Sequence, residues 1–435
     1  MDTTRHGLSA AAVITARPSP DESVGVDFSV TGGAPTHRAS GCIYGMTEDA
    51  SAPPDGFFHD VRFRALRAGG AQLDSPGGWV SGRYDRRWRA TRAQLLRARA
   101  LGGEFVLLPH DLWGADGHPI ARFPGDDGDW TDYDDFLSRV VADVRATRAP
   151  VRWDLWNEPD LAAFWNRPQA QYLELWRRTH RRVRAEFPTH AVVGPSTAGA
   201  PTTESGWWTR FLDFACAHDV VPDVVSWHTL PGDPVATAAA ADASLTARGI
   251  RRPYQINEYG AAAEQHPAGG AWYVARLERA GVDGLRANWA AGGDLHDDLA
   301  GLLVRDASGR HRPRGEWWVY RFYGTQTGVT ASVTPGVDHD AFATKTIGGA
   351  KVLVGGRATG DVVVGLRRLD TTSGIVVDDR VRVLVERIPH NGGAAVDGPV
   401  TVRDAVVTLT DNGTTVRLPH HTAEDAFTIT LLPAR

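Results

Sequence analysis

Short apolar runs alternate with amphipathic stretches from about residue 41 to residue 323, and this alternation constrains the fold more than any other feature. Eight runs have the character of strands: 42–44, 70–74, 104–110, 151–157, 191–195, 223–228, 253–257 and 284–289. Between them lie stretches of helical period, such as 133–144 and 172–183, each with one apolar stripe. Eight strand–helix units over about 290 residues predict an α/β fold, the (β/α)8 TIM barrel.

The pattern changes after residue 330 to Thr- and Val-rich alternation broken by turn residues. Strands are expected at 350–354, 361–366, 380–387, 400–408, 414–418 and 426–432, which predicts an accessory antiparallel β-sandwich. The segments 11–16 and 24–30 also have strand character and are expected to join this sandwich. The predicted organisation is therefore N-terminal strands in 1–35, the barrel in 36–330 and the C-terminal sandwich in 331–435.

Composition excludes several classes of partner. The net charge of −5, with Arg spread along the chain, argues against a nucleic-acid partner. No apolar run approaches the roughly 20 residues that a membrane span requires. The first residues make a poor secretory signal, so a cytoplasmic location is expected unless the N-terminus has been trimmed. Cys42 and Cys216 have no zinc-like or disulfide-framework spacing, and both are expected to be buried thiols.

Two glutamates stand at the ends of predicted barrel strands. Glu158 follows strand four and Glu258 follows strand seven, and their separation of 258 − 158 = 100 residues is ordinary for three barrel units. Both can converge at the mouth of a barrel, where active sites form. Glycosidic cleavage needs one carboxyl that protonates the leaving oxygen and one that is ionised. This pair therefore indicates glycoside cleavage without any cofactor.

The run Trp-Asn-Glu-Pro-Asp at 156–160 resembles the acid/base motif of the clan A glycoside hydrolases. With the preceding residues from 153 and Ser-Trp-His at 226–228, it is most similar to glycoside hydrolase family 39, which includes β-xylosidases, α-L-iduronidases and enzymes that act on arabinofuranosides. The resemblance implies that Glu158 is the acid/base, Glu258 the nucleophile and Asn157 a donor to a sugar hydroxyl. The chain departs from the family's xylosidases in Asn-Glu-Tyr-Gly at 257–260, which leaves the exact family and the substrate open.

Further candidates for sugar binding stand at or beyond the other strand ends. They are Asp74, His110, Asp111, His228, Asn288, Trp289, Asp294 and His296. A tryptophan is suited to the C–H face of a sugar, and the polar side chains to its hydroxyls. The alternative for His228 is a core histidine, and the alternative for Glu258 is a structural carboxylate paired with an arginine across the barrel. The acidic cluster at 294–298 is expected to bind hydroxyls and not a metal.

These features predict a retaining, exo-acting glycoside hydrolase that cleaves a plant- or microbe-derived oligosaccharide by double displacement. A pentoside, such as an arabinofuranoside or a xyloside, is favoured as the substrate. The alternatives are a transglycosylase and an inactive carbohydrate-binding protein on the same scaffold. Carboxyl groups about 5–5.5 Å apart would fit retention, and about 6.5–9.5 Å would fit inversion.

Overall fold

A computed structural model of the 435-residue chain describes residues 22–74, 76–116, 120–202, 204–287, 296–420 and 422–434. Eight parallel strands form a closed barrel, because the last strand pairs with the first through Leu285 and Gly41. The strands are β2 (Gly41–Ile43), β3 (Ala65–Ala68), β4 (Glu104–Leu107), β5 (Arg152–Asp154), β6 (Val192–Thr197), β7 (Val224–Thr229), β8 (Tyr254–Tyr259) and β9 (Asp283–Arg286). The expected barrel is confirmed.

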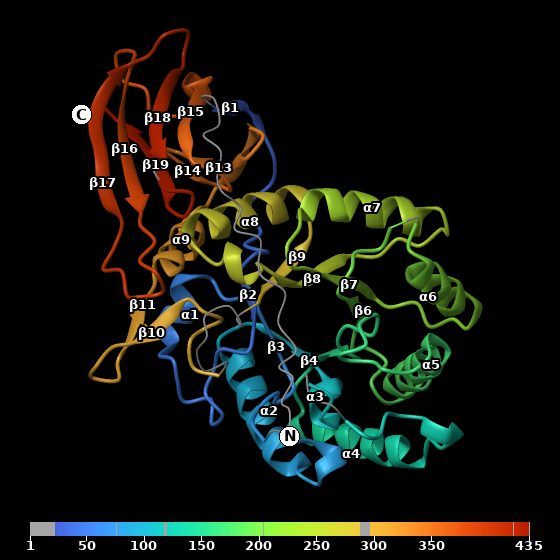
Figure 1. Cartoon of the computed structure of the whole chain (residues 1–435). Helices are drawn as coiled ribbons and strands as arrows, with labels where there is room; N and C mark the ends of the chain where they lie inside the picture. Colours follow the sequence, from blue (N-terminus) through green and yellow to red (C-terminus); the bar gives the residue numbers. More distant parts are fainter. Residues whose placement is uncertain are drawn as a thin grey trace, which may run out of the picture.

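Helices surround this barrel (Figure 1). They are α1 (Asp55–Asp60), α2 (Tyr84–Ala100), α3 (Pro109–Trp113), α4 (Thr131–Thr147), α5 (Gln169–Glu186), α6 (Gly206–Ala217), α7 (Pro234–Thr246), α8 (Pro267–Ala280) and α9 (Gly315–Gly324), with short 3₁₀ turns at Trp79–Ser81, Asp126–Gly128, Ala262–Glu264 and Leu369–Thr371. The apolar stripe expected in 133–144 is the buried face of α4. None of the helices in the described ranges is long and apolar enough to cross a membrane.

The second barrel strand lies earlier than the sequence pattern predicts. The expected strand at 70–74 is wrong, because the chain forms its strand at Ala65–Ala68 and turns at Gly70, where φ is 78°. The sequence pattern did not reveal this strand because it contains Arg67, a charged residue that is only 1% exposed inside the barrel. A charge in a four-residue strand interrupts the apolar run that marks a buried strand.

The remaining strands form one nine-stranded sheet with the order β17-β16-β19-β14-β13-β12-β1-β15-β18. They are β1 (Glu22–Thr31), β12 (Val329–Thr334), β13 (His339–Thr346), β14 (Gly349–Gly356), β15 (Gly360–Arg367), β16 (Arg380–Ile388), β17 (Val400–Thr408), β18 (Thr414–His420) and β19 (Ala426–Pro433), and a separate hairpin joins β10 (Leu303–Arg305) to β11 (His311–Pro313). Neighbouring strands are antiparallel except for the parallel pair β1 and β15. Val364 of β15 and Val383 of β16 share one hydrophobic core although their strands are distant in the sheet, so the sheet folds into a sandwich.

The N-terminal strand expected at 24–30 is β1, and it lies in this sheet between β12 and β15. The other expected N-terminal strand, at 11–16, lies outside the described residues. The expectation for Cys216 is wrong, because its side chain is exposed on α6, whereas Cys42 is buried in β2 as expected.

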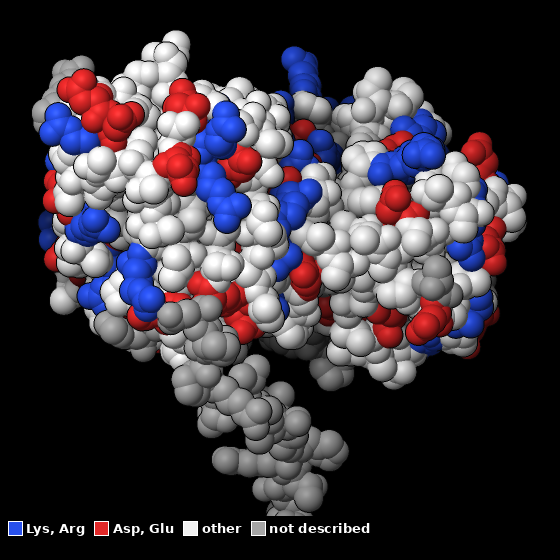
Figure 2. All heavy atoms as spheres, turned by 90° about the horizontal axis from the view of Figure 1, so that it is seen from above, with Lys and Arg blue, Asp and Glu red and all other residues white. Residues whose placement is uncertain are grey.

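The sheet rests on α8 of the barrel. Gly355 of β14 lies so close to α8 that a Cβ there would stand 2.2 Å from the carbonyl oxygen of Ala268. Arg276 and Arg279 of α8 both pair with buried Asp340 of β13, at 3.0 and 2.5 Å. Basic and acidic side chains are intermixed over the face seen in Figure 2, as the small net charge leads one to expect.

Candidate active site

Glu158 stands four residues beyond the end of β5, where the backbone turns sharply. Its φ is 41°, in the left-handed region, and its amide donates to the carbonyl oxygen of Ser196 in β6 at 2.9 Å. Pro159 follows and restricts the backbone further. Non-glycine residues held in this region are strained and cluster at functional sites. The turn places Glu158, a residue that is 9% exposed, at the mouth of the barrel.

Glu258 lies inside β8, one residue before its end, and is 2% exposed. The pairing of β7 with β8 shifts register after Trp227 and Ile256, so that His228 stands opposite Glu258. A bulge of this kind redirects side chains locally. It brings a histidine and a carboxylate together at the C-terminal ends of two neighbouring strands.

The two glutamates meet at His228. The Nδ1 of His228 donates to Oε1 of Glu158 at 2.8 Å and lies 3.4 Å from Oε2 of Glu258. One donor atom of each of these three residues lies within 4.8 Å of the others. The carboxylates therefore face one small space, close enough for both to reach a single bond of a ligand.

Arg67 of β3 also contacts this cluster, through Glu258. Its guanidinium donates to Glu258 Oε1 at 2.7 Å, to Asp154 Oδ2 at 2.6 Å and to the side-chain oxygen of Asn157 at 2.8 Å. The sequence reasoning missed Arg67 and Asp154 as site residues, although it named an arginine across the barrel as the alternative partner of Glu258. The sequence does contain one indication of Arg67: it is a charged residue among the apolar residues of Ala-Leu-Arg-Ala at 65–68.

A polar layer lies beneath the cluster. Asp154 accepts hydrogen bonds from Ser196 Oγ at 2.7 Å and from the Asn257 side-chain amide at 2.8 Å, in addition to Arg67. Ser196 also contacts Ser226 Oγ at 2.7 Å. Asp154 and Asn257 are fully buried. Because buried polar groups with several partners are fixed in place, this layer orients Arg67, and Arg67 in turn orients Glu258.

The protonation of the three ionisable groups is coupled. Burial raises the pKa of Glu258 to about 7, although His228 and Arg67 act in the opposite direction. Burial also raises the pKa of Glu158, but the hydrogen bond and charge of His228 outweigh it and leave that pKa below its usual value. Burial lowers the pKa of His228, and the two carboxylates more than offset this and raise it. These shifts favour a proton on His228 and leave Glu258 only partly protonated near neutral pH.

His110 and Asp111 lie in α3, directly after β4, as the sequence predicted. His110 Nδ1 donates to Asp111 Oδ1 at 2.9 Å, and the hydroxyl of Tyr44 donates to the other oxygen of the Asp111 carboxylate. The His110 ring also packs edge-on against Trp156, with 4.7 Å between ring centroids. Both residues therefore stand beside the Glu158 turn.

The other predicted site residues do not all lie at strand ends. Asp74 does not end a strand; it lies in the loop after β3 and pairs with Arg86 at 2.6 Å and Arg83 at 3.5 Å. His296 donates through Nε2 to the carbonyl oxygen of Ala71 at 2.8 Å, and its ring packs edge-on against Tyr44 with 5.4 Å between ring centroids. Asn288, Trp289 and Asp294 lie outside the described residues.

One group of three His and Glu donors in the described part of the chain is close enough to hold a metal, and it is the cluster of Glu158, His228 and Glu258 itself. Two of its members are the carboxylates that glycosidic cleavage would use. The paired-carboxylate interpretation assigns no metal to it.

Comparisons with known proteins agree with the fold. No family model matches the chain. A curated β-xylosidase from Geobacillus stearothermophilus is 36% identical over 134 residues, which make up 29% of this chain and 26% of that protein. The match thus spans about a quarter of the length of that relative.

Solved structures match over nearly the whole chain. A protein from Neocallimastix frontalis has a TM-score of 0.77 at 21% identity and covers 95% of this chain and 100% of its own. A family 39 enzyme from Xanthomonas axonopodis pv. citri has a TM-score of 0.61 at 16% identity and covers 98% and 100%. A family 39 β-xylosidase from Caulobacter crescentus has a TM-score of 0.56 at 17% identity and covers 94% and 100%.

Fold and site together define a class. A closed (β/α)8 barrel with a β-sandwich and two carboxylates at its mouth is an arrangement of glycoside hydrolases. The resemblance to clan A, and within it to family 39, is confirmed at the level of the fold.

Proposed function

We propose that this chain is a retaining glycoside hydrolase that acts by double displacement, with Glu158 as the acid/base and Glu258 as the nucleophile. The observation that carries the proposal is the approach of the two carboxylates: one oxygen of each, together with a ring nitrogen of His228, lies within 4.8 Å of the others. Retaining enzymes keep their carboxyl groups about 5–5.5 Å apart, whereas inverting enzymes leave room for a water at about 6.5–9.5 Å. The close approach of an oxygen of Glu158 to an oxygen of Glu258 supports retention.

The contacts of each glutamate support its proposed role. Glu258 is held by Arg67 at 2.7 Å, so one of its oxygens is fixed and the other, Oε2, can face an anomeric carbon. Glu158 is more exposed and sits on a turn beside His228. An acid/base must exchange protons with the leaving group and then with water, so a more accessible position suits it.

The pKa shifts of the two glutamates run opposite to what the first step needs. Glu258 must be ionised to attack and Glu158 must be protonated, yet burial keeps the pKa of Glu258 at about 7 and His228 lowers that of Glu158. We propose that the substrate shifts one proton from Glu258 to Glu158. The two arrangements hold the same number of protons and differ by one transfer between carboxylate oxygens that lie within 4.8 Å of each other.

The substrate proposed is a terminal pentoside, such as a xyloside or an arabinofuranoside, removed from an oligosaccharide by exo action. The curated relative from Geobacillus stearothermophilus and the family 39 structure from Caulobacter crescentus are both β-xylosidases, which supports a pentoside. Asn157, held by Arg67 at 2.8 Å, is proposed to bind the hydroxyl next to the anomeric carbon.

The test is a panel of aryl α- and β-pentosides, hexosides and uronides assayed with the wild type, Glu158→Gln and Glu258→Gln. Each variant is expected to lose several orders of magnitude in turnover on the preferred substrate. Azide should rescue a Glu258→Gly variant with a glycosyl azide of the opposite anomeric configuration, and a Glu158→Ala variant with one of retained configuration. Wild-type turnover in either glutamine variant would remove that residue from the mechanism.

Two further outcomes separate the alternatives. Sugar binding in isothermal titration without turnover of any aryl glycoside would identify an inactive binding protein. Predominant transfer to an added acceptor alcohol, in place of hydrolysis, would identify a transglycosylase.

A further inference from the structure

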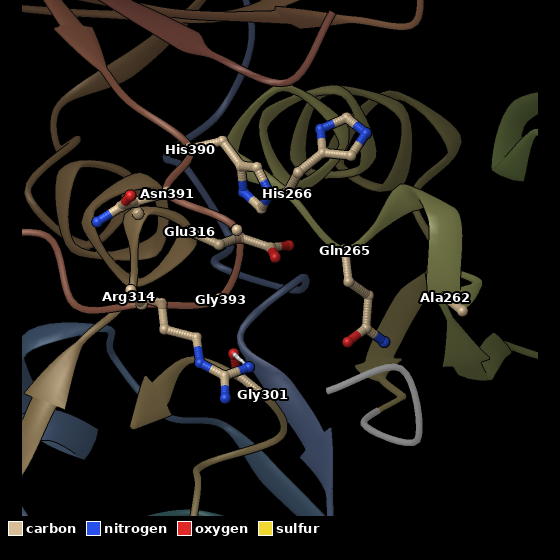
Figure 3. Close-up of a pocket in the computed structure, with 12 residues that line it drawn as sticks. Ala262, Gln265, His266, Gly301, Arg314, Glu316, His390, Asn391 and Gly393 are labelled. Carbon is tan, nitrogen blue, oxygen red and sulfur yellow. Dashed lines mark hydrogen bonds between the residues drawn. The ribbon is translucent and has the colours of Figure 1, made fainter. Parts of the chain in front are cut away.

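A cavity of about 300 Å³ lies between the barrel and the sheet, apart from the two glutamates (Figure 3). Its lining comes from four segments: 262–266 after β8, Gly301, 314–316 at the start of α9, and 390–394 between β16 and β17. None of Glu158, Glu258, His228 and Arg67 belongs to this lining. The cavity is therefore a separate feature, built jointly by the two parts of the fold.

Arg314 brings a positive charge to this cavity. No carboxylate of the described residues lies within 4.0 Å of its guanidinium, and its one described side-chain hydrogen bond is a 3.4 Å contact to the carbonyl oxygen of Gly301 (Figure 3). Its Nε is buried and has no acceptor among the described groups. A buried donor without an acceptor is costly, so the fold leaves this guanidinium incompletely satisfied.

The carboxylate that lines the same cavity is already matched. Both oxygens of Glu316 accept hydrogen bonds from the guanidinium of Arg286, and Glu316 is only 3% exposed. Arg286 and Glu316 thus form a two-pronged ion pair, which cancels both charges. The other cation beside the cavity is Arg314, on which the charges of Asp298 and Glu316 act without a described ion pair.

His390 and the two glycines that follow it closely line the cavity together with Arg314. His390 extends its ring toward the middle of the view in Figure 3, and its loop is fixed by the hydrogen bond from its amide to Asp425 at 2.7 Å. Gly392 and Gly393 follow with φ of 52° and 87°, and an added Cβ at either would meet nothing within 4 Å. The cavity wall is therefore bare backbone there, and a ligand can approach it closely.

We propose that this cavity binds a small oxyanion, a carboxylate or a phosphate, through the guanidinium of Arg314 and the ring of His390. A guanidinium matches the paired oxygens of either group, and the volume of the cavity accommodates a monosaccharide acid as well as an inorganic ion. The site is independent of the proposed glycosidase activity, because it shares no residue with the glutamate cluster.

The experiment is isothermal titration of the full chain at neutral pH and low salt with sodium glucuronate, inorganic phosphate and, as a neutral probe, glucose. The variants are Arg314→Gln, His390→Gln and the control Arg312→Gln. Arg312 is a neighbouring arginine whose guanidinium pairs with exposed Asp397 at 2.6 Å, outside the cavity lining. Glu158→Gln is titrated as well, to separate this site from the glutamate cluster.

We expect glucuronate or phosphate to bind the wild type and glucose to bind at least about tenfold more weakly. Arg314→Gln and His390→Gln should each weaken the anion about tenfold or more, while Arg312→Gln and Glu158→Gln bind it as the wild type does. The anion that binds more tightly shows whether the ligand of the cavity is a sugar acid or a phosphate. Absence of anion binding at millimolar concentration, or unchanged affinity in folded Arg314→Gln and His390→Gln, would overturn the proposal.

Discussion

Arg67 and Glu258 form a buried ion pair across the interior of the barrel, with 2.7 Å between Nη1 and Oε1 and 2% side-chain exposure on both residues. The pair joins β3 to β8, which are not neighbours in the barrel. Arg67 also holds Asp154 at 2.6 Å, so one guanidinium balances two buried carboxylates. Removal of one member of such a set leaves the others uncompensated.

Replacement of Arg67 by Met should therefore damage both stability and activity. Glu258 and Asp154 would lose their shared cation, which is expected to lower the free energy of unfolding by about 3–5 kcal/mol. Turnover should fall about 10²-fold to 10³-fold, because Glu258 would be neither oriented nor ionised. Chemical denaturation and kcat on the preferred aryl glycoside provide the measurements.

Arg67→Lys is the matched control for charge. It keeps the cation but cannot reach both carboxylates with a planar fork, so its losses should be smaller than those of Arg67→Met. Equal activity in the wild type and Arg67→Met would show that the pair has no part in the reaction.

His228 should determine the pH above which kcat/KM falls, that is, the alkaline limb of its pH profile. Because the pKa of Glu258 is about 7, kcat/KM of the wild type should fall above about pH 7, as the cluster loses the proton that Glu158 must deliver. The imidazolium of His228 lowers the pKa of both glutamates, so in His228→Gln both should rise and the limb should move to higher pH.

The control for this profile is His180→Gln. His180 is a buried histidine of α5 with no contact to either glutamate, and its replacement should leave the limb in place. An unshifted limb in His228→Gln would contradict the coupling of the three groups.

The free energy of unfolding should also depend on pH through the buried carboxyl group of Glu258. Its pKa is about 7 in the folded protein and about 4.5 in an unfolded chain. Since the folded value is raised, the contribution of this group is fully present below pH 4.5 and is lost as the pH rises through 7. The free energy of unfolding of the wild type minus that of Glu258→Gln should therefore fall by on the order of 3 kcal/mol between pH 4 and pH 8. Urea melts at several pH values measure it, and a pH-independent difference would refute it.

The sequence predicted the residues whose type and position follow a local rule. Glu158 and Glu258 end apolar runs at barrel spacing, and His110 and His228 follow strands in the same way, so their places at the barrel mouth could be found. Arg67 could not, because its role depends on partners 87 and 191 residues away in the chain. Asp74 was misplaced for the same reason, since the strand that contains Arg67 was not recognised.

The register of the strands could not be predicted from the sequence pattern either. His228 stands opposite Glu258 because of a shift in the pairing of β7 with β8, and no local signal marks that shift. The sheet order, with β1 inserted between β12 and β15, likewise depends on long-range packing of apolar faces. Periodicity identifies which face of a strand is buried but not which strand lies beside it.

The loop after α3 depends on Gly114, whose replacement by Ala should destabilise the fold. Its φ is 102°, and a Cβ there would stand 1.9 Å from the carbonyl oxygen of Gly77, which is backbone and cannot swing away. Gly114→Ala should lower the free energy of unfolding by more than about 2 kcal/mol and reduce activity, because α3 carries His110 and Asp111. Gly102→Ala is the control, since its φ is 82° but nothing lies within 4 Å of the added Cβ, and it should cost only about 1 kcal/mol. Equal melting temperatures for the two variants would show that the contact with Gly77 does not limit this loop.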